Sequence, residues 1–149
     1  TIITTTSTGV GIGSTTPTAA LDVASPARLQ AYYEFAETVT SSINVITLDL
    51  SKGQTFLNTT TENIAKFVLS KAVPGSSASF TLRITQGATP RTVAIDTFEN
   101  ASGTSIPVYW PGGVVPTVTN VANITDIYSY ITFDGGTTLY GVVGGQNFS

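Results

Sequence analysis

IYSYITFDGGTTLYGVV, residues 127–143, is the stretch of sequence that decides the fold. Two runs rich in β-branched and aromatic residues flank Asp134-Gly135-Gly136, and an Asp-Gly pair accommodates the positive φ angles of a tight hairpin turn. Between Ile127 and Phe133 apolar residues fall on both parities, which is typical of a strand covered on both faces. The stretch therefore predicts a β-hairpin at the centre of a sheet, with the rest of the chain covering it.

Shorter runs of alternating apolar and polar residues recur along the chain before this hairpin. Residues 80–84 are the clearest case, and residues 46–50 and 65–69 show the same period of two. Turn-forming residues separate these runs, which are about five to eight residues long, and this spacing is typical of an antiparallel sandwich. We therefore predict an all-β fold: an antiparallel, jelly-roll-like β-sandwich with an extended N-terminal arm.

Residues 26–40 allow two predictions. Ser25-Pro26 can begin a helix with Leu29 and Tyr32 at helical spacing. Tyr33 to Val39 can instead alternate as a strand. We favour the strand because everything after it is rich in β-formers.

The composition narrows the chemistry that the chain can perform. Its 149 residues fit one domain with an appended arm, and it contains no Cys, no Met and no His. Zinc sites with Cys or His ligands, haem ligation by His, Cys nucleophiles and Ser-His triads therefore have no residues to form them. We expect no metal and no cofactor.

The low charge of the chain limits its partners. Charged residues make up 10%, against about 25% in typical soluble domains. The net charge is −3 and the six basic residues are scattered, so we expect no nucleic-acid partner. No apolar run approaches the roughly 18 residues needed to span a bilayer, and no signal peptide is recognisable, so we expect no membrane insertion.

Residues 1–25 differ from residues 26–149, and we predict a boundary between them. The first segment is rich in Thr, Ser and Gly and has only small apolar islands, too small for a core of its own. One interpretation is a flexible leader. The other, which we favour, is an arm that docks on neighbouring subunits or on a larger assembly. Its candidate anchoring residues are Val10, Ile12, Pro17, Leu21 and Val23.

The carboxylates do not suggest a catalytic pair. Glycoside hydrolysis requires two carboxyl groups at a fixed distance with different pKa values. Glu34 and Glu37 point to opposite faces if they lie on a strand. Asp126 and Asp134 lie near opposite ends of one predicted strand, and the hairpin turn accounts for Asp134. We therefore expect that the protein is not an enzyme.

The segment Trp110-Pro111-Gly112-Gly113 is the most informative aromatic site. Trp-Pro favours an extended or turned backbone, and the two glycines allow a sharp reversal. Trp110 either covers an edge of the core at a corner, or stands exposed at a loop tip where it stacks on a sugar ring or grips a partner. The candidate surface-binding aromatic residues are Tyr109, Trp110, Tyr128, Tyr130 and Tyr140.

Two parts of the chain resemble virion proteins of tailed bacteriophages. Residues 9–23, GVGIGSTTPTAALDV, are similar to the GIGTT-x-P-x-A-x-L-x-V segment that recurs in tail fibres. The region from about Tyr33 to Phe148 resembles a domain of virion proteins from phages of cyanobacteria and other marine bacteria. The matching pieces are Glu37-Thr38-Val39, Leu48-Asp49-Leu50-Ser51-Lys52-Gly53, Ser79-Phe80-Thr81-Leu82-Arg83-Ile84, Trp110-Pro111-Gly112-Gly113 with Pro116, Asp126-Ile127-Tyr128, and Asp134-Gly135-Gly136-Thr137-Thr138 with Tyr140-Gly141.

This resemblance implies a β-sandwich that forms a homotrimer on the outer surface of a phage particle and is made in the host cytoplasm. It brings no catalytic residues. The expected function is a tail fibre or receptor-binding component that recognises a host surface glycan. Through its arm, the chain would bind itself and other virion proteins, such as a tail adaptor or the major capsid protein.

The chain has no room for the large shaft and separate attachment domain of a long fibre. A capsid decoration protein that clamps capsomers, as a cement or head-fibre protein does, is therefore the main alternative. A polysaccharide depolymerase and a free carbohydrate-binding module are weaker alternatives, because the first needs a carboxylate pair and the second more often carries a secretion signal.

Overall fold

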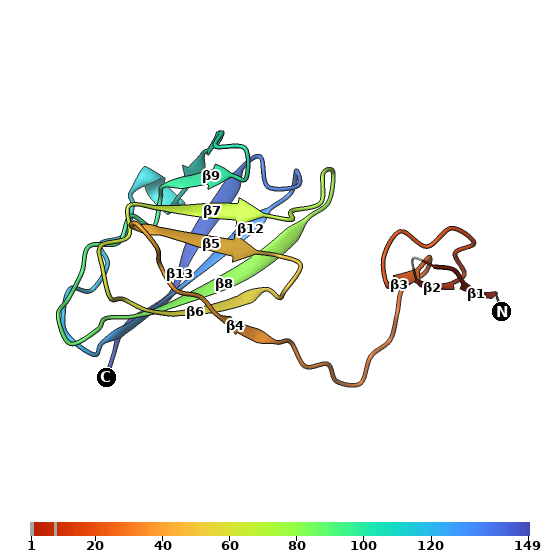
Figure 1. Cartoon of the computed structure of the whole chain (residues 1–149), viewed down its shortest axis with the longest axis horizontal. Coiled ribbons are helices and arrows are strands. Elements are labelled where there is room, and N and C mark those ends of the chain that lie inside the picture. The colour runs from red at the N-terminus through yellow and green to blue at the C-terminus, as the bar shows by residue number, and fades with distance from the viewer. Residues whose placement is uncertain (1, 8) are drawn as a thin grey trace. The chain divides into compact units, whose positions relative to one another are not determined.

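A computed structural model of the chain describes residues 2–7 and 9–149 (Figure 1). The chain divides into two compact units, Thr1–Tyr33 and Glu34–Ser149, so the division falls later than the predicted boundary at residue 25. Regular structure in the described residues is β-strand apart from one 3-10 turn, Pro111–Gly113. The all-β prediction is confirmed. The part of the chain that is described contains no helix long and apolar enough to cross a membrane.

The first unit is a small three-stranded sheet. Its strands are β1 (Ile3–Thr5), β2 (Val10–Ile12) and β3 (Leu21–Val23). Strand β1 pairs antiparallel with β2, and β2 pairs parallel with β3. The backbone of the predicted arm is extended in these three segments. The segments pair with one another in a sheet instead of forming one extended arm.

The second unit contains two sheets. The smaller has four strands in the order β10 (Ser105–Ile106), β9 (Phe98–Asn100), β7 (Lys66–Ser70) and β5 (Val45–Asp49). The larger has six strands in the order β11 (Val108–Tyr109), β13 (Leu139–Phe148), β12 (Thr125–Thr132), β8 (Ala78–Thr85), β6 (Thr55–Thr59) and β4 (Ala36–Thr38). Figure 1 shows the strands of the two sheets in this unit.

Both sheets of the second unit are mixed, so the prediction of purely antiparallel strand pairing is wrong. Strands β5, β7 and β9 run parallel to one another, and so do β4, β6 and β8. The β9–β10 and β8–β12 pairs are antiparallel. The reason lies in the connections: from β4 to β9 each strand crosses to the other sheet instead of turning back beside its predecessor. Every second strand then returns to the same sheet in the same direction.

One core cluster joins the two sheets. Most of the predicted inward residues of 80–84, 46–50 and 65–69 supply it, with Phe80, Leu82 and Ile84 each at most 1% exposed. Ala65 is exposed and lies outside strand β7, and Leu50 is only partly buried. Phe98 from the smaller sheet meets Tyr130 from the larger sheet with ring centroids 4.9 Å apart. The core therefore consists of side chains from the inner faces of both sheets, and the period-two prediction is confirmed in these strands.

The predicted hairpin is present as β12 and β13, which lie inside the larger sheet between β11 and β8. Gly135 and Gly136 have φ angles of 74° and 85°, the left-handed conformation that the sequence predicts for the turn. The prediction that β12 is covered on both faces is wrong for the single chain. Tyr128 and Tyr130 are fully buried, whereas Ile127 and Ile131 on the other face stay partly exposed.

Residues 26–40 contain one short strand and no helix. Strand β4 pairs parallel with β6, and the residues before it, 25–35, have no regular structure. The favoured strand prediction is thus correct only for Ala36–Thr38. Val39 adds a single hydrogen bond, from its N–H to Leu57 O at 2.9 Å.

Candidate functional surfaces

The β1–β3 sheet has one bare apolar face. Pairing register places Ile3, Ile12 and Val23 side by side, and Val10 beside Leu21. Residues two apart on a strand share a face, so these five side chains form one surface, which we call the arm face. Ile3 is 67% and Leu21 61% exposed. Four of the five predicted anchoring residues therefore lie together.

The opposite face of this sheet is covered by its own loop. Thr18 donates its backbone N–H to Asp22 Oδ2 at 3.0 Å, which ties the loop after β2 to β3. Gly11 is buried there, and a side chain at this position would overlap the backbone oxygen of Ser14. Pro17, the fifth predicted anchoring residue, is buried. Its role is therefore to complete the small unit rather than to present a contact surface.

The arm face carries no charge. Asp22 is the single charged residue before Arg28, and it points to the loop-covered side. Burying one exposed Leu or Ile side chain contributes about 1.5–3 kcal/mol, so covering this face is favourable. Identical copies can meet through it without like-charge repulsion. The arrangement suits self-association or docking on an apolar partner.

A second exposed surface is a row of three aromatic side chains on the outer face of the larger sheet. Tyr109, Phe133 and Tyr140 are 57%, 67% and 45% exposed. The rings of Tyr109 and Phe133 each lie 5.8 Å from the ring of Tyr140, centroid to centroid. We call these residues the aromatic row. Beside it, Tyr140 and Val142 border an apolar hollow of about 610 Å³.

Three of the predicted surface aromatic residues belong to the core instead. Tyr128 and Tyr130 are fully buried, and Trp110 is 6% exposed. Trp110 packs edge-to-face on both tyrosines, with centroid distances of 6.2 and 5.7 Å. The surface prediction is therefore corrected for these three residues. Tyr128 and Tyr130 lie on the buried face of β12. Trp110 packs over Gly141, where a Cβ atom would lie 2.7 Å from the indole ring. The corner interpretation of Trp110 is the one that the structure supports.

Asp126 is the one carboxylate buried among the described residues, and its side chain is surrounded by hydrogen-bond donors of the protein. Its oxygens accept hydrogen bonds from four groups: Thr119 N–H (2.7 Å), Tyr128 OH (2.9 Å), Asn147 N–H (2.9 Å) and Gln146 Nε2 (3.3 Å). Burial alone would raise the pKa of Asp126, but the hydrogen bonds outweigh it and hold the pKa below its ordinary value. Burial, together with the hydrogen bond to Asp126, raises the pKa of Tyr128.

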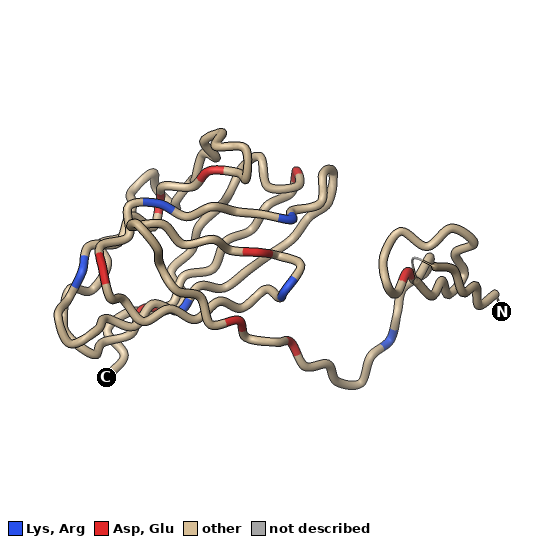
Figure 2. Tube along the Cα trace, viewed as in Figure 1, with Lys and Arg blue, Asp and Glu red and all other residues tan. Residues whose placement is uncertain are grey.

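The other carboxylates considered from the sequence do not form a pair. Asp134 holds the hairpin turn, where hydrogen bonds from Thr137, Thr132 and Thr138 lower its pKa. Glu37 forms an ion pair with Lys52 at 3.4 Å. Charged residues are sparse and scattered over Glu34–Ser149 (Figure 2). Within the described ranges no three His, Cys, Asp or Glu side chains gather where a metal ion could bind.

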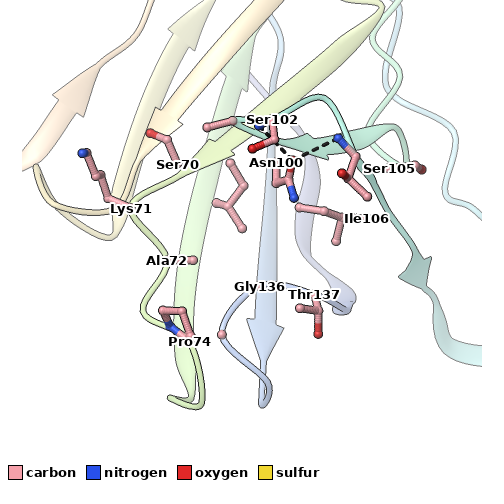
Figure 3. Close-up of a pocket in the computed structure, with 14 residues that line it drawn as sticks. Ser70, Lys71, Ala72, Pro74, Asn100, Ser102, Ser105, Ile106, Gly136 and Thr137 are labelled. Carbon is pink, nitrogen blue, oxygen red and sulfur yellow. Dashed lines mark hydrogen bonds between the residues drawn. The ribbon is translucent and has the colours of Figure 1, made fainter.

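A polar hollow of about 370 Å³ lies where three loops meet in the second unit (Figure 3). The loops follow β7, join β9 to β10 and join β12 to β13. Leu69, Ala72 and Ile106 supply apolar lining, and Asn100 and Thr137 supply polar lining. Neither this hollow nor Phe133 is among the residues predicted from the sequence. Phe133 has the same parity as Ile127 and Ile131, which would have revealed its outward position once Tyr128 and Tyr130 were placed inside.

No protein-family model matches the chain, and neither the curated proteins nor the solved structures contain a match. The resemblance to phage virion proteins therefore stays a prediction from the quoted motifs.

Proposed function

We propose that this chain is a structural protein of a phage virion, a homotrimer whose Glu34–Ser149 unit is a β-sandwich displayed on the particle surface. The observation that carries the proposal is the arm face. It is apolar and uncharged, and it is exposed in a unit whose strands are only three residues long. Sheets this small are marginal alone, and burial between copies or against another virion protein stabilises them.

The second unit supplies what a displayed domain needs. Its core of apolar side chains joins two sheets, and a surface low in charge suits stable assemblies. Within this proposal we favour a tail fibre or receptor-binding component. The aromatic row is the support for it, since exposed aromatic faces stack on sugar rings and three copies raise avidity.

Incorporation into particles tests the proposal. We expect Leu21→Asp to lower the amount of this protein in purified phage at least about tenfold, because a buried unpaired carboxylate costs several kcal/mol. Leu29→Asp is the matched control: Leu29 is 69% exposed and lies outside the β1–β3 sheet. Equal incorporation of both variants would contradict the anchoring role of the arm face.

A capsid decoration protein remains the second candidate, and the arm face favours it equally, because clamping capsomers needs the same apolar docking. Host adsorption separates the two. If the chain is a receptor-binding component, the purified protein added in excess should block adsorption of the phage to its host. Tyr140→Ala in the aromatic row should then weaken that block. Free decoration protein leaves adsorption unchanged, and that result would remove the receptor-binding role while leaving the virion assignment intact.

A further inference from the structure

The polar hollow of Figure 3 contains one fixed hydrogen-bond donor without a partner among the described residues. Asn100 Oδ1 accepts the backbone N–H groups of Ser102 and Thr104, both at 2.9 Å. Only the oxygen of the amide can accept two donors, so these bonds fix which way the amide faces. Its nitrogen is then directed into the hollow beside Ile106 (Figure 3). The two N–H bonds of this nitrogen are available to a ligand.

The surroundings of this donor are part apolar and part hydroxyl. Leu69 and Ile106 border the hollow but are each only 3% exposed, so the apolar surface open to a ligand comes mainly from Ala72, Pro74 and Ala101. Thr137 and Ser105 place hydroxyl-bearing side chains on the lining. Lys71 is the one charged lining residue, and Figure 3 shows its ammonium group directed away from Asn100. The inside of the hollow is therefore uncharged.

The walls of the hollow are held in place before any ligand arrives. Gly135 donates its N–H to Ser76 O at 2.9 Å, which joins the hairpin turn to the loop after β7. Gly136 N–H donates to Thr132 Oγ1 at 2.8 Å. Gly136 also has no room for a side chain, because a Cβ there would lie 2.9 Å from the Cβ of Ala72. A preformed wall lowers the ordering cost of binding.

We propose that this hollow binds a neutral saccharide ring through Asn100. The Asn100 nitrogen would donate to ring or hydroxyl oxygens, and the C–H face of the sugar would lie on the accessible apolar lining of Ala72 and Pro74. A volume of about 370 Å³ lies in the range of small-molecule sites. The inference deepens the receptor-binding part of the proposed function and rests on it for the source of the sugar. It is independent of the arm face and of the trimer.

The test is an NMR titration of the full-length protein with methyl α-D-glucopyranoside, methyl β-D-galactopyranoside and N-acetylglucosamine. We expect at least one sugar to bind with a millimolar Kd and to shift the Asn100 side-chain NH₂ signals and the amides of Ala72 and Gly136. Absence of shifts at these groups with all three sugars overturns the proposal, and so does binding that shifts only the aromatic row.

Two variants sharpen the result. Asn100→Asp keeps the oxygen that accepts from Ser102 and Thr104 but removes the donor, so we expect an affinity loss of about tenfold or more with an unchanged spectrum elsewhere. Lys71→Gln is the control that should bind as the wild type does, because its charge lies outside the hollow. Wild-type affinity in Asn100→Asp contradicts the role of the Asn100 donor. These solution measurements do not depend on incorporation into a particle, so the two proposals can fail separately.

Discussion

Trp110 and Gly141 form a matched pair at the scale of single residues. The indole ring lies over Gly141 on strand β13 and packs edge-to-face on Tyr128 and Tyr130. Any side chain at residue 141 would displace it. The indole Nε1 is buried without a hydrogen-bond partner among the described residues, so Trp110 contributes through packing rather than through its polar atom.

This packing predicts the effect of truncating Trp110. We expect Trp110→Ala to lower the free energy of unfolding by about 3–5 kcal/mol, because it opens a cavity between the sheets. Trp110→Phe should cost less, since it keeps an aromatic ring and removes an unsatisfied N–H. Chemical denaturation with Tyr109→Ala as the exposed control measures both. A loss below about 1 kcal/mol in Trp110→Ala would show that the indole is not part of the core.

Single residues also show where sequence patterns succeed and where they stop. The alternation in residues 80–84 identifies the buried Phe80, Leu82 and Ile84, because a strand with one face in the core repeats every two residues. In β12 both parities are apolar, and the pattern cannot say which face is inside. Tyr128 and Tyr130, which the sequence suggests as binding residues, are core residues of β12. The exposed Phe133 is not among the binding residues predicted from the sequence.

At the scale of elements, Asp126 connects three segments of the second unit. Its carboxylate joins β12 to residue 119 in the preceding loop and to Asn147 at the end of β13. Gln146 adds a hydrogen bond to Thr117 O at 2.6 Å and one to Tyr128 OH at 2.8 Å. The network ties the last strand to β12 and to the preceding loop.

The lowered pKa of Asp126 makes a pH-dependent prediction. A carboxyl group whose pKa is lower in the folded than in the unfolded chain stabilises the fold above the unfolded pKa of about 3.9, and this contribution is lost as the pH falls through the lower folded pKa. We expect Asp126→Asn to cost about 1–3 kcal/mol at neutral pH. The difference from wild type should shrink below about pH 4.

Urea denaturation between neutral and acidic pH measures this difference, and Asp96→Asn on the exposed surface is the matched control. A difference between wild type and Asp126→Asn that stays constant with pH would contradict the ionised state of the buried carboxylate.

The sequence patterns do not predict how the strands are connected across the two sheets. Turn signals mark where strands end, and most strands are found where they were predicted. The same signals do not reveal whether the next strand pairs with its predecessor or crosses to the other sheet. Here the chain crosses repeatedly from β4 to β9, which produces parallel pairs. The hairpin at Asp134 was predictable because two glycines with positive φ specify a reversal locally.

At the scale of the whole molecule, the two units differ in what they bury. Glu34–Ser149 has its own core, whereas in Thr1–Tyr33 the large apolar side chains of the arm face remain exposed. The sequence indicated this difference through the small apolar islands of residues 1–25. It did not indicate that the islands pair into a sheet with a loop over one face, because that arrangement depends on the contacts of Gly11 and Asp22.

We propose that copies of the chain bury the arm face against one another in the homotrimer. Sedimentation equilibrium of the full-length protein tests it most directly. We expect the mass of a trimer of the 15.5 kDa chain for wild type and for Leu29→Asp, and a monomer for Leu21→Asp. A wild-type monomer, or a trimer that persists in Leu21→Asp, would contradict the claim.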